Sequence, residues 1–495
     1  MTLRAEHVKY MFCSFFVTNL KRILTYLEKC EAALAAFIPA AKAALVIKNY
    51  LDCKEDYILV FSMKVKQTLF SLIDEMEQYR WLFTQIPQKN FSRMKKWSFS
   101  EVIKFILTAE SGSLRDELLK YFDYKLNTPS NSSFNQRRAQ ILPEAFEFLF
   151  QEFNQSYDMT QLFNGLHIVA CDGSDLNISY TPEDATTYFS QGIDQKGYNQ
   201  LHLNAMYDLC SRRYIDAVIQ PGRKKNECQA MTKMIDRFKG DSNTLFMADR
   251  GYESYNVFAH VQEKGMFYLI RARDANNNCI IAGLKQLPKT DEYDVIIPLR
   301  ITRSQTKEIK QNPEIYKYIA SSTPLDYIDC ENKYYDITLR IVRFKLTSNT
   351  YECVITNLPQ DKYPPEVLKE LYGTRWGIET SFRELKYAVG LAAFHSKKTE
   401  YIIQEIWSRL ILYNFCEIIT TSIVVPKLSS RKHDYQLNYT RAIKICLYFL
   451  RIKKEKAPPN VENLIRQELL PVRVGRTDPR KVKPQSAISF LYRVA

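Results

Sequence analysis

Short apolar runs of β-strand length begin at residue 166 and recur along the next hundred residues. The runs are Leu166–Cys171, Leu201–Leu209, Tyr214–Ile219, Thr244–Ala248 and Met266–Arg271. Apolar runs of about four to eight residues between turn signals are typical of buried strands. Between the last three runs the pattern predicts helices over Glu227–Lys239 and Tyr255–Lys264, capped by Asn226 and Ser254.

This order of elements predicts an α/β fold. Three strands in a meander, followed by alternating helix and strand, is the element order of a ribonuclease H-like core. The stretch 272–359 breaks the alternation, because Tyr293–Ile301, Tyr334–Leu346 and Tyr351–Asn357 are period-2 or β-rich. We interpret it as a β-rich insertion inside the core. Pro364 and Pro365 then open a long helix.

Helical spacing dominates on both sides of the core, so we expect helical N-terminal and C-terminal regions. The predicted division is a helical extension of unknown role over 1–62, a helical DNA-binding domain over 63–160, the core over 161–271 and 360–395, the β-rich insertion over 272–359, and a helical C-terminal region with a basic arm over 396–495.

One helix pair in the N-terminal region has the layout of a DNA-reading motif. A helix over Leu114–Phe122 precedes the polar turn Asn127–Ser133 and a second helix over Phe134–Phe148, with Ser132 or Ser133 as its cap. The first turns of the second helix carry Asn135, Gln136, Arg137 and Arg138. Arg137 and Arg138 are the candidate DNA contacts. The alternative, a surface helix with a basic end, stays open.

The charge of the chain favours a polyanionic partner. The 69 Lys and Arg residues exceed the 55 Asp and Glu residues, for a net charge of +14. Such an excess points first to nucleic acid and second to an anionic membrane, with simple solubility as the alternative. Eleven cysteines without a CxxC pair, and only six histidines, argue against zinc and disulfides. We expect a cytoplasmic protein without a membrane-spanning segment.

The long helix carries one regular polar face. Tyr372 is followed 3, 7 and 14 residues later by Arg375, Glu379 and Lys386. At about 100° per residue these four side chains fall within an arc of roughly 60°. A single acid among two cations and a phenol suits a carboxylate that holds a metal while its neighbours hold phosphates.

Two aspartates are the natural partners of Glu379. Asp172 follows the strand IVAC and Asp249 follows LFMA, and ligands of open α/β sheets bind at the carboxyl ends of strands. Three converging carboxylates repel unless cations sit between them, and oxygen ligands favour Mg²⁺ or Mn²⁺. Each acid also has a plainer interpretation: a turn residue for either aspartate, and a pair with Arg375 or Arg383 for Glu379. Asp175 and Asp208 are interpreted as turn and surface residues.

The segments ACDGS, ADRGY and LYGTRWGIETSFRELK together resemble the DDE transposases of bacterial insertion sequences, specifically insertion-sequence family four with its Tyr-Arg-Glu-Lys signature. The resemblance is sharp over 166–394. It implies that Asp172, Asp249 and Glu379 are catalytic ligands of two Mg²⁺ ions, which Mn²⁺ can replace. It also implies phosphate contacts by Tyr372, Arg375 and Lys386, whereas Trp376 is expected in the core.

The resemblance further implies an enzyme that cleaves double-stranded DNA at terminal inverted repeats and joins the ends to target DNA by cut-and-paste. A homodimer on two DNA ends, associated with the bacterial nucleoid, is expected. Two alternatives remain. One is a catalytically silent DNA-binding protein derived from a transposase. The other is a structure-specific nuclease on the same fold.

Overall fold

The computed structural model describes nine segments of the chain, together with the backbone of Leu491 and Tyr492. The segments are 61–93, 96–110, 112–157, 162–190, 196–273, 279–347, 350–425, 433–452 and 458–472. From Ser62 onward the described residues belong to one compact unit. Residues 1–60 of the predicted extension over 1–62 and most of the predicted basic arm lie outside the described residues, and the predicted domain boundaries stay predictions.

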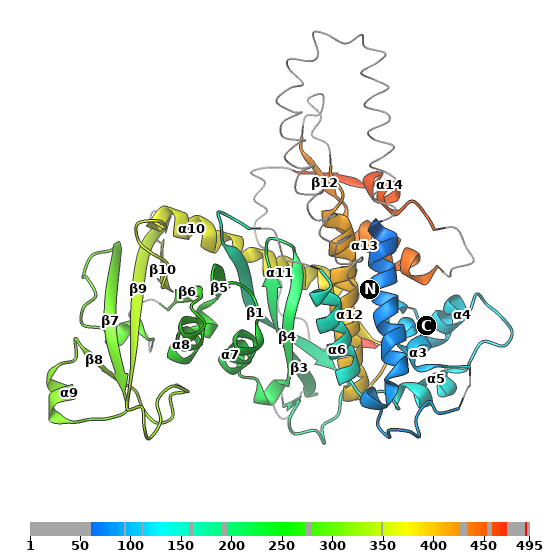
Figure 1. Cartoon of the computed structure of the whole chain (residues 1–495), viewed down its shortest axis with the longest axis horizontal. Coiled ribbons are helices and arrows are strands. Elements are labelled where there is room, and N and C mark those ends of the chain that lie inside the picture. The colour runs from blue at the N-terminus through cyan, green and yellow to red at the C-terminus, as the bar shows by residue number, and fades with distance from the viewer. Residues whose placement is uncertain are drawn as a thin grey trace, which may run out of the picture. The chain divides into compact units, whose positions relative to one another are not determined.

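One large mixed sheet forms the centre of this unit (Figure 1). Its neighbours follow the order β2-β3-β1-β5-β6-β10-β9-β7-β8, and β4 lies beside β3. β1, β5 and β6 run parallel, whereas β3 and β4 are antiparallel to their neighbours. The strands are β1 (His167–Ile178), β2 (Tyr188–Phe189), β3 (Tyr198–Asp208), β4 (Arg213–Pro221), β5 (Thr244–Ala248), β6 (Phe267–Ala272), β7 (Tyr293–Thr302), β8 (Tyr316–Tyr318), β9 (Tyr334–Thr347) and β10 (Thr350–Thr356).

The predicted β-rich stretch adds strands to this same sheet. β10 pairs antiparallel with the core strand β6, and β9 and β7 follow outward from β10. The strands predicted over 293–301, 334–346 and 351–357 are therefore confirmed, and they continue the central sheet instead of forming a second one. The strands β7 and β8 thus lie at the end of the sheet that is farther from the parallel strands β1 and β5.

Helices cover both faces of the sheet, and the alternation of side chains along the strands explains how. Phe246 and Ala248 of β5 join one buried cluster with α7 (Glu227–Arg237) and α8 (Tyr255–Glu263). Leu245 and Met247 point the other way, into a cluster with α10 (Pro365–Thr374). Successive side chains of a strand point to opposite faces, so a continuous apolar run marks a strand that is covered twice.

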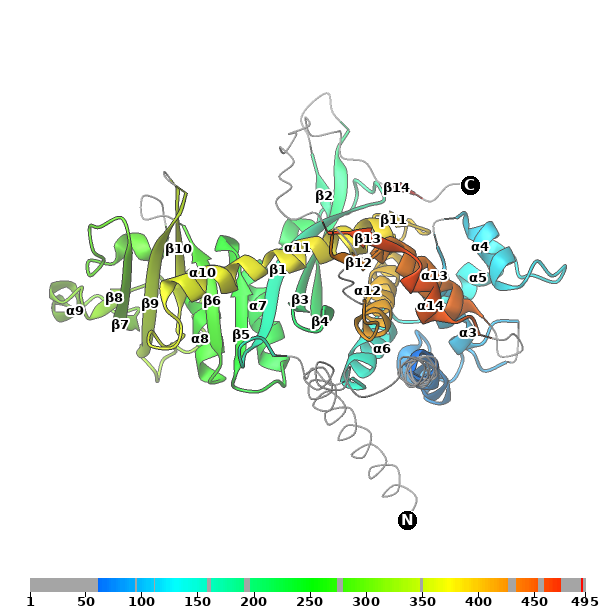
Figure 2. The same cartoon turned by 90° about the horizontal axis from the view of Figure 1, so that it is seen from above.

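The predicted long helix consists of three consecutive parts. α10 ends at Thr374, α11 spans Trp376–Arg383, and a π-helical turn covers Glu384–Ala388. Figure 2 shows α10 and α11 following one another across the strands of the sheet. Pro365 begins α10, as predicted, because proline lacks only an N–H that the first helical turn leaves unpaired anyway.

Helices from both ends of the described chain pack together beside the sheet. Residues 61–78 are helical and are followed by η1 (Arg80–Phe83), α3 (Phe99–Thr108), α4 (Leu114–Tyr121), α5 (Asn131–Arg138), α6 (Glu144–Gln155), α12 (Thr399–Thr421), α13 (Tyr439–Arg451) and α14 (Val461–Arg466). α12 is buried on nearly every side and packs against α3, α6, α13 and β4. None of the helices in the described part combines the length and apolar character that crossing a bilayer requires.

The predicted helix over Phe134–Phe148 is wrong, because two helices occupy this region. α5 ends at Arg138, and α6 begins after Pro143. Ile141, between them, bridges to Thr84 as a single β-pair. The predicted caps Ser132 and Ser133 are wrong as well, since Ser130 accepts the backbone N–H of Ser133.

The predicted DNA contact of Arg138 is also wrong. Its side chain is 2% exposed and forms an ion pair with Glu405 at 3.0 Å. The remaining guanidinium donors bind the Gln404 side chain and the Tyr401 carbonyl oxygen. Burial opposes ionisation of Glu405, but Arg138 and His395 hold the pKa of that carboxyl well below its usual range. Arg138 therefore joins α5 to α12, and Arg137, which bonds Gln140, stays the candidate for DNA.

Replacing Arg138 tests this structural assignment. Breaking a buried ion pair from one side leaves the other charge without compensation, so Arg138→Ala should lower the free energy of unfolding by about 3–5 kcal/mol. Arg137→Ala is the matched control and should cost about 1 kcal/mol or less. Chemical denaturation of the two variants measures both values. Equal small losses would show that Arg138 does not hold α5 against α12.

Candidate active site

Asp172 and Asp249 lie at the same end of two paired strands. Cys171 of β1 pairs with Ala248 of β5, so each aspartate is the next residue along its strand. Asp249 leaves the sheet there, as predicted. The predicted strand end at Asp172 is wrong, because β1 continues to Ile178 along β3. Asp172 is thus the first residue of β1 beyond the parallel pairing, where the edge of the strand is no longer covered by β5.

Local hydrogen bonds fix both carboxylates. Asp172 Oδ1 accepts the N–H of Gly173 at 2.8 Å. Asp249 Oδ1 accepts the N–H of Gly251 at 2.7 Å, at the start of the short helix η3 (Arg250–Tyr252). One oxygen of each carboxylate is therefore engaged by the backbone.

Glu379 reaches this region from α11, and Arg375 lies between it and Asp172. Arg375 Nη2 contacts Glu379 Oε1 at 2.7 Å, and Nη1 lies 3.7 Å from Asp172 Oδ2. The Arg375 side chain is only 7% exposed. The pair of Glu379 with Arg375, which the sequence left open, is therefore formed in this structure. Nε and Nη1 of Arg375 are buried and make no hydrogen bond within the described residues.

The electrostatics of Asp172 report a crowded acidic site. The pKa of Asp172 is raised to about 6, chiefly by burial and in smaller part by the charges of Asp249 and Glu379. The Gly173 N–H and the Arg375 guanidinium act in the opposite direction. The pKa of Asp172 therefore depends on the other two carboxylates as well as on its own burial, because nearby like charges disfavour the ionised form.

These three side chains offer only oxygen donors, the ligand type that Mg²⁺ and Mn²⁺ prefer. Within the described ranges, no three His, Cys, Asp or Glu side chains are already gathered at metal-binding distance. Arg375 occupies the position between Asp172 and Glu379, which accounts for the separation. The donor chemistry fits a hard divalent cation, and in this structure one oxygen of Glu379, Oε1, is bound by Arg375.

The other residues of the helical face also reach the ends of β1 and β5. Tyr372 is 5% exposed, and its hydroxyl donates to the Ala248 carbonyl oxygen at 3.5 Å. Burial raises its pKa to about 12. Lys386 Nζ, on the π-helical turn, donates to the Asp175 carbonyl oxygen at 3.1 Å. Their roles as phosphate contacts stay predictions, and the burial of Tyr372 gives it a packing role in addition.

Three other expectations about side chains are wrong. Trp376 is 59% exposed and does not belong to the core. Asp208 is fully buried on β3, where His167 Nε2 lies 3.3 Å from its carboxylate. Asp175 lies within β1 and accepts a 2.6 Å hydrogen bond from His202 Nδ1. Each error concerns a partner from a distant part of the chain or an exposure that local sequence does not encode.

Sequence reasoning missed His202 and Glu227 altogether. His202 Nε2 lies 3.0 Å from Glu227 Oε1, and Glu227 is the first residue of α7. Burial lowers the pKa of His202, but the two carboxylates beside it raise the net value. The predicted cap Asn226, which accepts the Gln229 N–H, is confirmed and places Glu227 at this point. Nothing in the local sequence signals its contact with His202.

Comparison with known proteins identifies the family. A family profile described as "Transposase DDE domain" matches residues 164–415, a range that contains Asp172, Asp249 and Glu379. The chain belongs to the DDE transposase family. It is a DNA transposase of the insertion-sequence type, as the sequence predicted.

Two curated relatives and one solved structure illustrate the similarity. The transposase InsG for insertion sequence element IS4 of Escherichia coli (strain K12) is 22% identical, over 64% of this chain and 68% of the relative. The transposase for insertion sequence element IS231F of Bacillus thuringiensis subsp. israelensis is 23% identical, over 63% and 69%. The piggyBac transposase synaptic complex with hairpin DNA has 12% identity and a TM-score of 0.41, covering 84% of this chain and 87% of that one.

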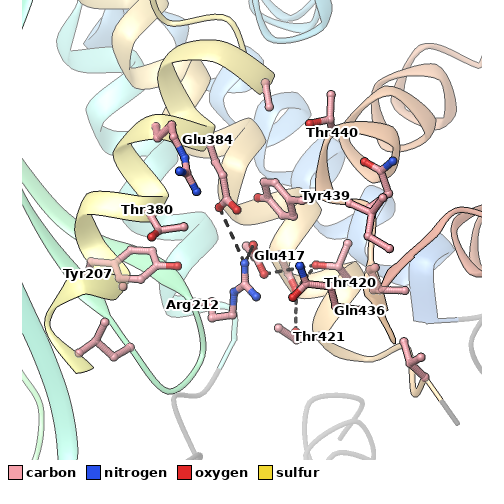
Figure 3. Close-up of a pocket in the computed structure, with 18 of the residues that line it drawn as sticks. Tyr207, Arg212, Thr380, Glu384, Glu417, Thr420, Thr421, Gln436, Tyr439 and Thr440 are labelled. Carbon is pink, nitrogen blue, oxygen red and sulfur yellow. Dashed lines mark hydrogen bonds and ion pairs between the residues drawn. The ribbon is translucent and has the colours of Figure 1, made fainter. Parts of the chain in front are cut away.

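The transposase also has a cavity of about 960 Å³ beside α11, and no carboxylate of the predicted triad lines it. Figure 3 shows Arg212 pointing between Glu384 and Glu417, with Nη2 at 3.8 Å and 3.2 Å from their carboxylates. The pKa of Glu417 is raised to about 7, chiefly by burial and in smaller part by the charge of Glu384, although Arg212 acts in the opposite direction. These contacts join α12 to the π-helical turn that carries Lys386.

The Glu417 carboxyl makes stability depend on pH. Its pKa rises from an ordinary 4.5 to about 7 on folding, so the folded state keeps a proton that the unfolded chain releases. The free energy of unfolding should therefore fall as pH rises from about 5 to about 7. Glu417→Gln should remove this component, and denaturant titrations across that range measure it. Parallel pH profiles for the variant and the parent protein would contradict the assignment.

Proposed function

We propose that this transposase works by cut-and-paste: it cleaves at the inverted-repeat ends of its element and joins the freed ends to target DNA. The observation that supports the proposal best is the position of Arg375 between Asp172 and Glu379, with Asp172 and Asp249 side by side on neighbouring strands. The three acids come from β1, the turn after β5 and α11, and the two aspartates directly follow the last residues of the parallel pairing between β1 and β5. In this proposal they are the catalytic carboxylates.

We infer that the centre of the sheet is a ribonuclease H-like core. The strands β4, β3 and β1 form an antiparallel meander, and β5 and β6 continue from β1 in parallel. The connection between β5 and β6 runs through α8, which packs on the sheet. This is the order of elements predicted from residues 166–271. The strands β7 to β10 extend it between Asp249 and Glu379.

In this proposal Asp172, Asp249 and Glu379 hold two Mg²⁺ ions, for which Mn²⁺ can substitute. When bound, such ions activate a water or a 3′-hydroxyl and stabilise the leaving oxygen of a phosphodiester. The residues of the chain do the rest of the work. Gly173 and Gly251 N–H groups orient the two aspartates, and Arg375 holds Glu379 and releases it as the site fills.

The proposed DNA contacts surround these acids. Lys386 is half-buried, Arg375 retains two buried donors, and both lie beside the strand ends. A guanidinium fork and an ammonium are the usual ligands of phosphate oxygens. The net charge of +14 supports a double-stranded DNA partner, with Arg137 on α5 as a further contact. A homodimer on two DNA ends, associated with the nucleoid in the cytoplasm, completes the proposal.

Glu379→Gln tests the catalytic proposal. The amide keeps the size of the side chain but loses the charge, so it should abolish strand cleavage of a duplex that bears the element's own end. Binding of that duplex should remain, because Glu379 is not a proposed DNA contact. Gel assays with Mg²⁺ separate cleavage, strand joining and binding. Cleavage that survives the substitution would refute the three-carboxylate model, and cleavage without joining would favour the nuclease alternative.

Lys386→Ala tests the DNA contact. One lost phosphate contact should weaken end binding and reduce the salt dependence of the binding constant by about 0.9 per contact. Lys369→Ala is the matched control, because Lys369 lies on α10 and also donates to a backbone carbonyl oxygen, that of Lys345. Fluorescence anisotropy at several salt concentrations gives both slopes. The assignment fails if the two alanine variants behave alike.

A further inference from the structure

His202 is held between two carboxylates directly behind the candidate active site. On one side its Nδ1 hydrogen bonds Asp175 Oδ1 at 2.6 Å, and on the other its Nε2 lies 3.0 Å from Glu227 Oε1. The His202 side chain is 3% exposed, so water does not compete for either contact. Asp175 belongs to β1, three residues beyond Asp172, and Glu227 opens α7. One imidazole thus ties together β1, β3 and α7.

Glu227 lies close to both glycines that follow Asp172 and Asp249, and His202 lies close to the first of them. A side-chain carbon added at Gly173 would lie 2.4 Å from His202 Nε2 and 2.8 Å from Glu227 Oε1. A carbon added at Gly251 would lie 3.0 Å from Asp249 Oδ1 and 3.1 Å from Glu227 Oε2. The Glu227 carboxylate therefore fills the space between the two glycines that follow Asp172 and Asp249.

Further contacts connect this group to the turn after β5 and to the catalytic helix. Cys228 Sγ, the next residue of α7, lies 3.5 Å from the Gly251 carbonyl oxygen. On the opposite side, Lys386 Nζ donates to the Asp175 carbonyl oxygen at 3.1 Å. A continuous series of contacts thus runs from the π-helical turn through Asp175, His202 and Glu227 to the residues that follow Asp249.

We propose that His202 and Glu227 are positioning residues of the transposase: they hold the backbone at Gly173 and Gly251 so that Asp172 and Asp249 face one divalent metal site. The proposal rests on the proposed function, since it assigns a supporting role toward the same metal site. Groups behind metal ligands orient those ligands, and their loss typically costs about 10- to 100-fold in metal affinity. Glu227 places a fourth carboxylate against the Asp249 turn, although the proposal needs no direct bond from it to metal.

The chain contains a matched control for a purely structural role. His260 on α8 is also buried between two carboxylates, Asp236 and Asp326, at 2.6 Å and 3.0 Å. The two distances match those of His202, but these partners do not adjoin Gly173 or Gly251. Loss of either histidine should therefore cost similar folding stability. Only loss of His202 should change metal binding.

The experiment measures Mn²⁺ affinity of the full-length protein by electron paramagnetic resonance, with the element's end duplex present. The portion of binding that Asp172→Asn removes defines the site. His202→Phe and Glu227→Gln should weaken that binding about 10- to 100-fold, whereas His260→Phe should leave it unchanged. Thermal unfolding of each variant shows that it is folded and how much stability it has lost.

Two further variants distinguish the two contacts that the ring nitrogens of His202 make. Glutamine keeps a donor nitrogen near the position of Nε2, and asparagine keeps one near Nδ1. His202→Gln should therefore retain more Mn²⁺ affinity than His202→Asn, because it preserves the contact with Glu227.

If the parent protein binds Mn²⁺ at Asp172 but every His202 and Glu227 variant binds it as His260→Phe does, the positioning role is overturned and the proposed function stands. If the parent protein has no binding that Asp172→Asn removes, both fail.

Discussion

The candidate active site of this transposase depends on how the fold keeps acidic side chains close together. Asp172 and Glu379 come from β1 and α11, and each would repel the other without a cation between them. Arg375 supplies that charge from one turn before Glu379, and its burial makes its contact with Asp172 stronger than it would be in water. The site is therefore organised without a metal ion, because the arginine supplies the positive charge that neutralises the two carboxylates.

The rest of the fold holds this arrangement in place. Both faces of β1 and β5 are covered, by α7 and α8 on one side and α10 on the other, so the strand ends carrying Asp172 and Asp249 cannot shift independently. Tyr372 anchors α10 to the Ala248 carbonyl oxygen, one residue before Asp249. α12 connects the helical region to the core through Arg138 and Asn414. Packing of the helices against the sheet thus holds the charged side chains of the site in place.

The sequence predicted those features of the fold that short-range patterns of residues encode. Apolar runs predicted the core strands, and the parallel pairing of β1 with β5 places Asp172 and Asp249 on neighbouring strands. The spacing on the long helix predicted the pair of Arg375 with Glu379 as one possibility, and the structure contains it. It failed where the answer is a distant partner. The sequence predicted that Arg138 contacts DNA, whereas the structure pairs it with Glu405, which lies 267 residues later in the chain. His202 and Glu227 carry no local signal, because their shared role depends on how two glycines approach in space.

A crystal structure of the protein with Mn²⁺ and end DNA, with anomalous scattering recorded at the manganese edge, tests most directly whether Asp172, Asp249 and Glu379 form one metal site. The account predicts manganese between the carboxylates of Asp172 and Asp249, with Glu379 turned from Arg375 toward the metal and Arg375 on a phosphate. Manganese bound elsewhere, with Glu379 still paired to Arg375, would contradict the account.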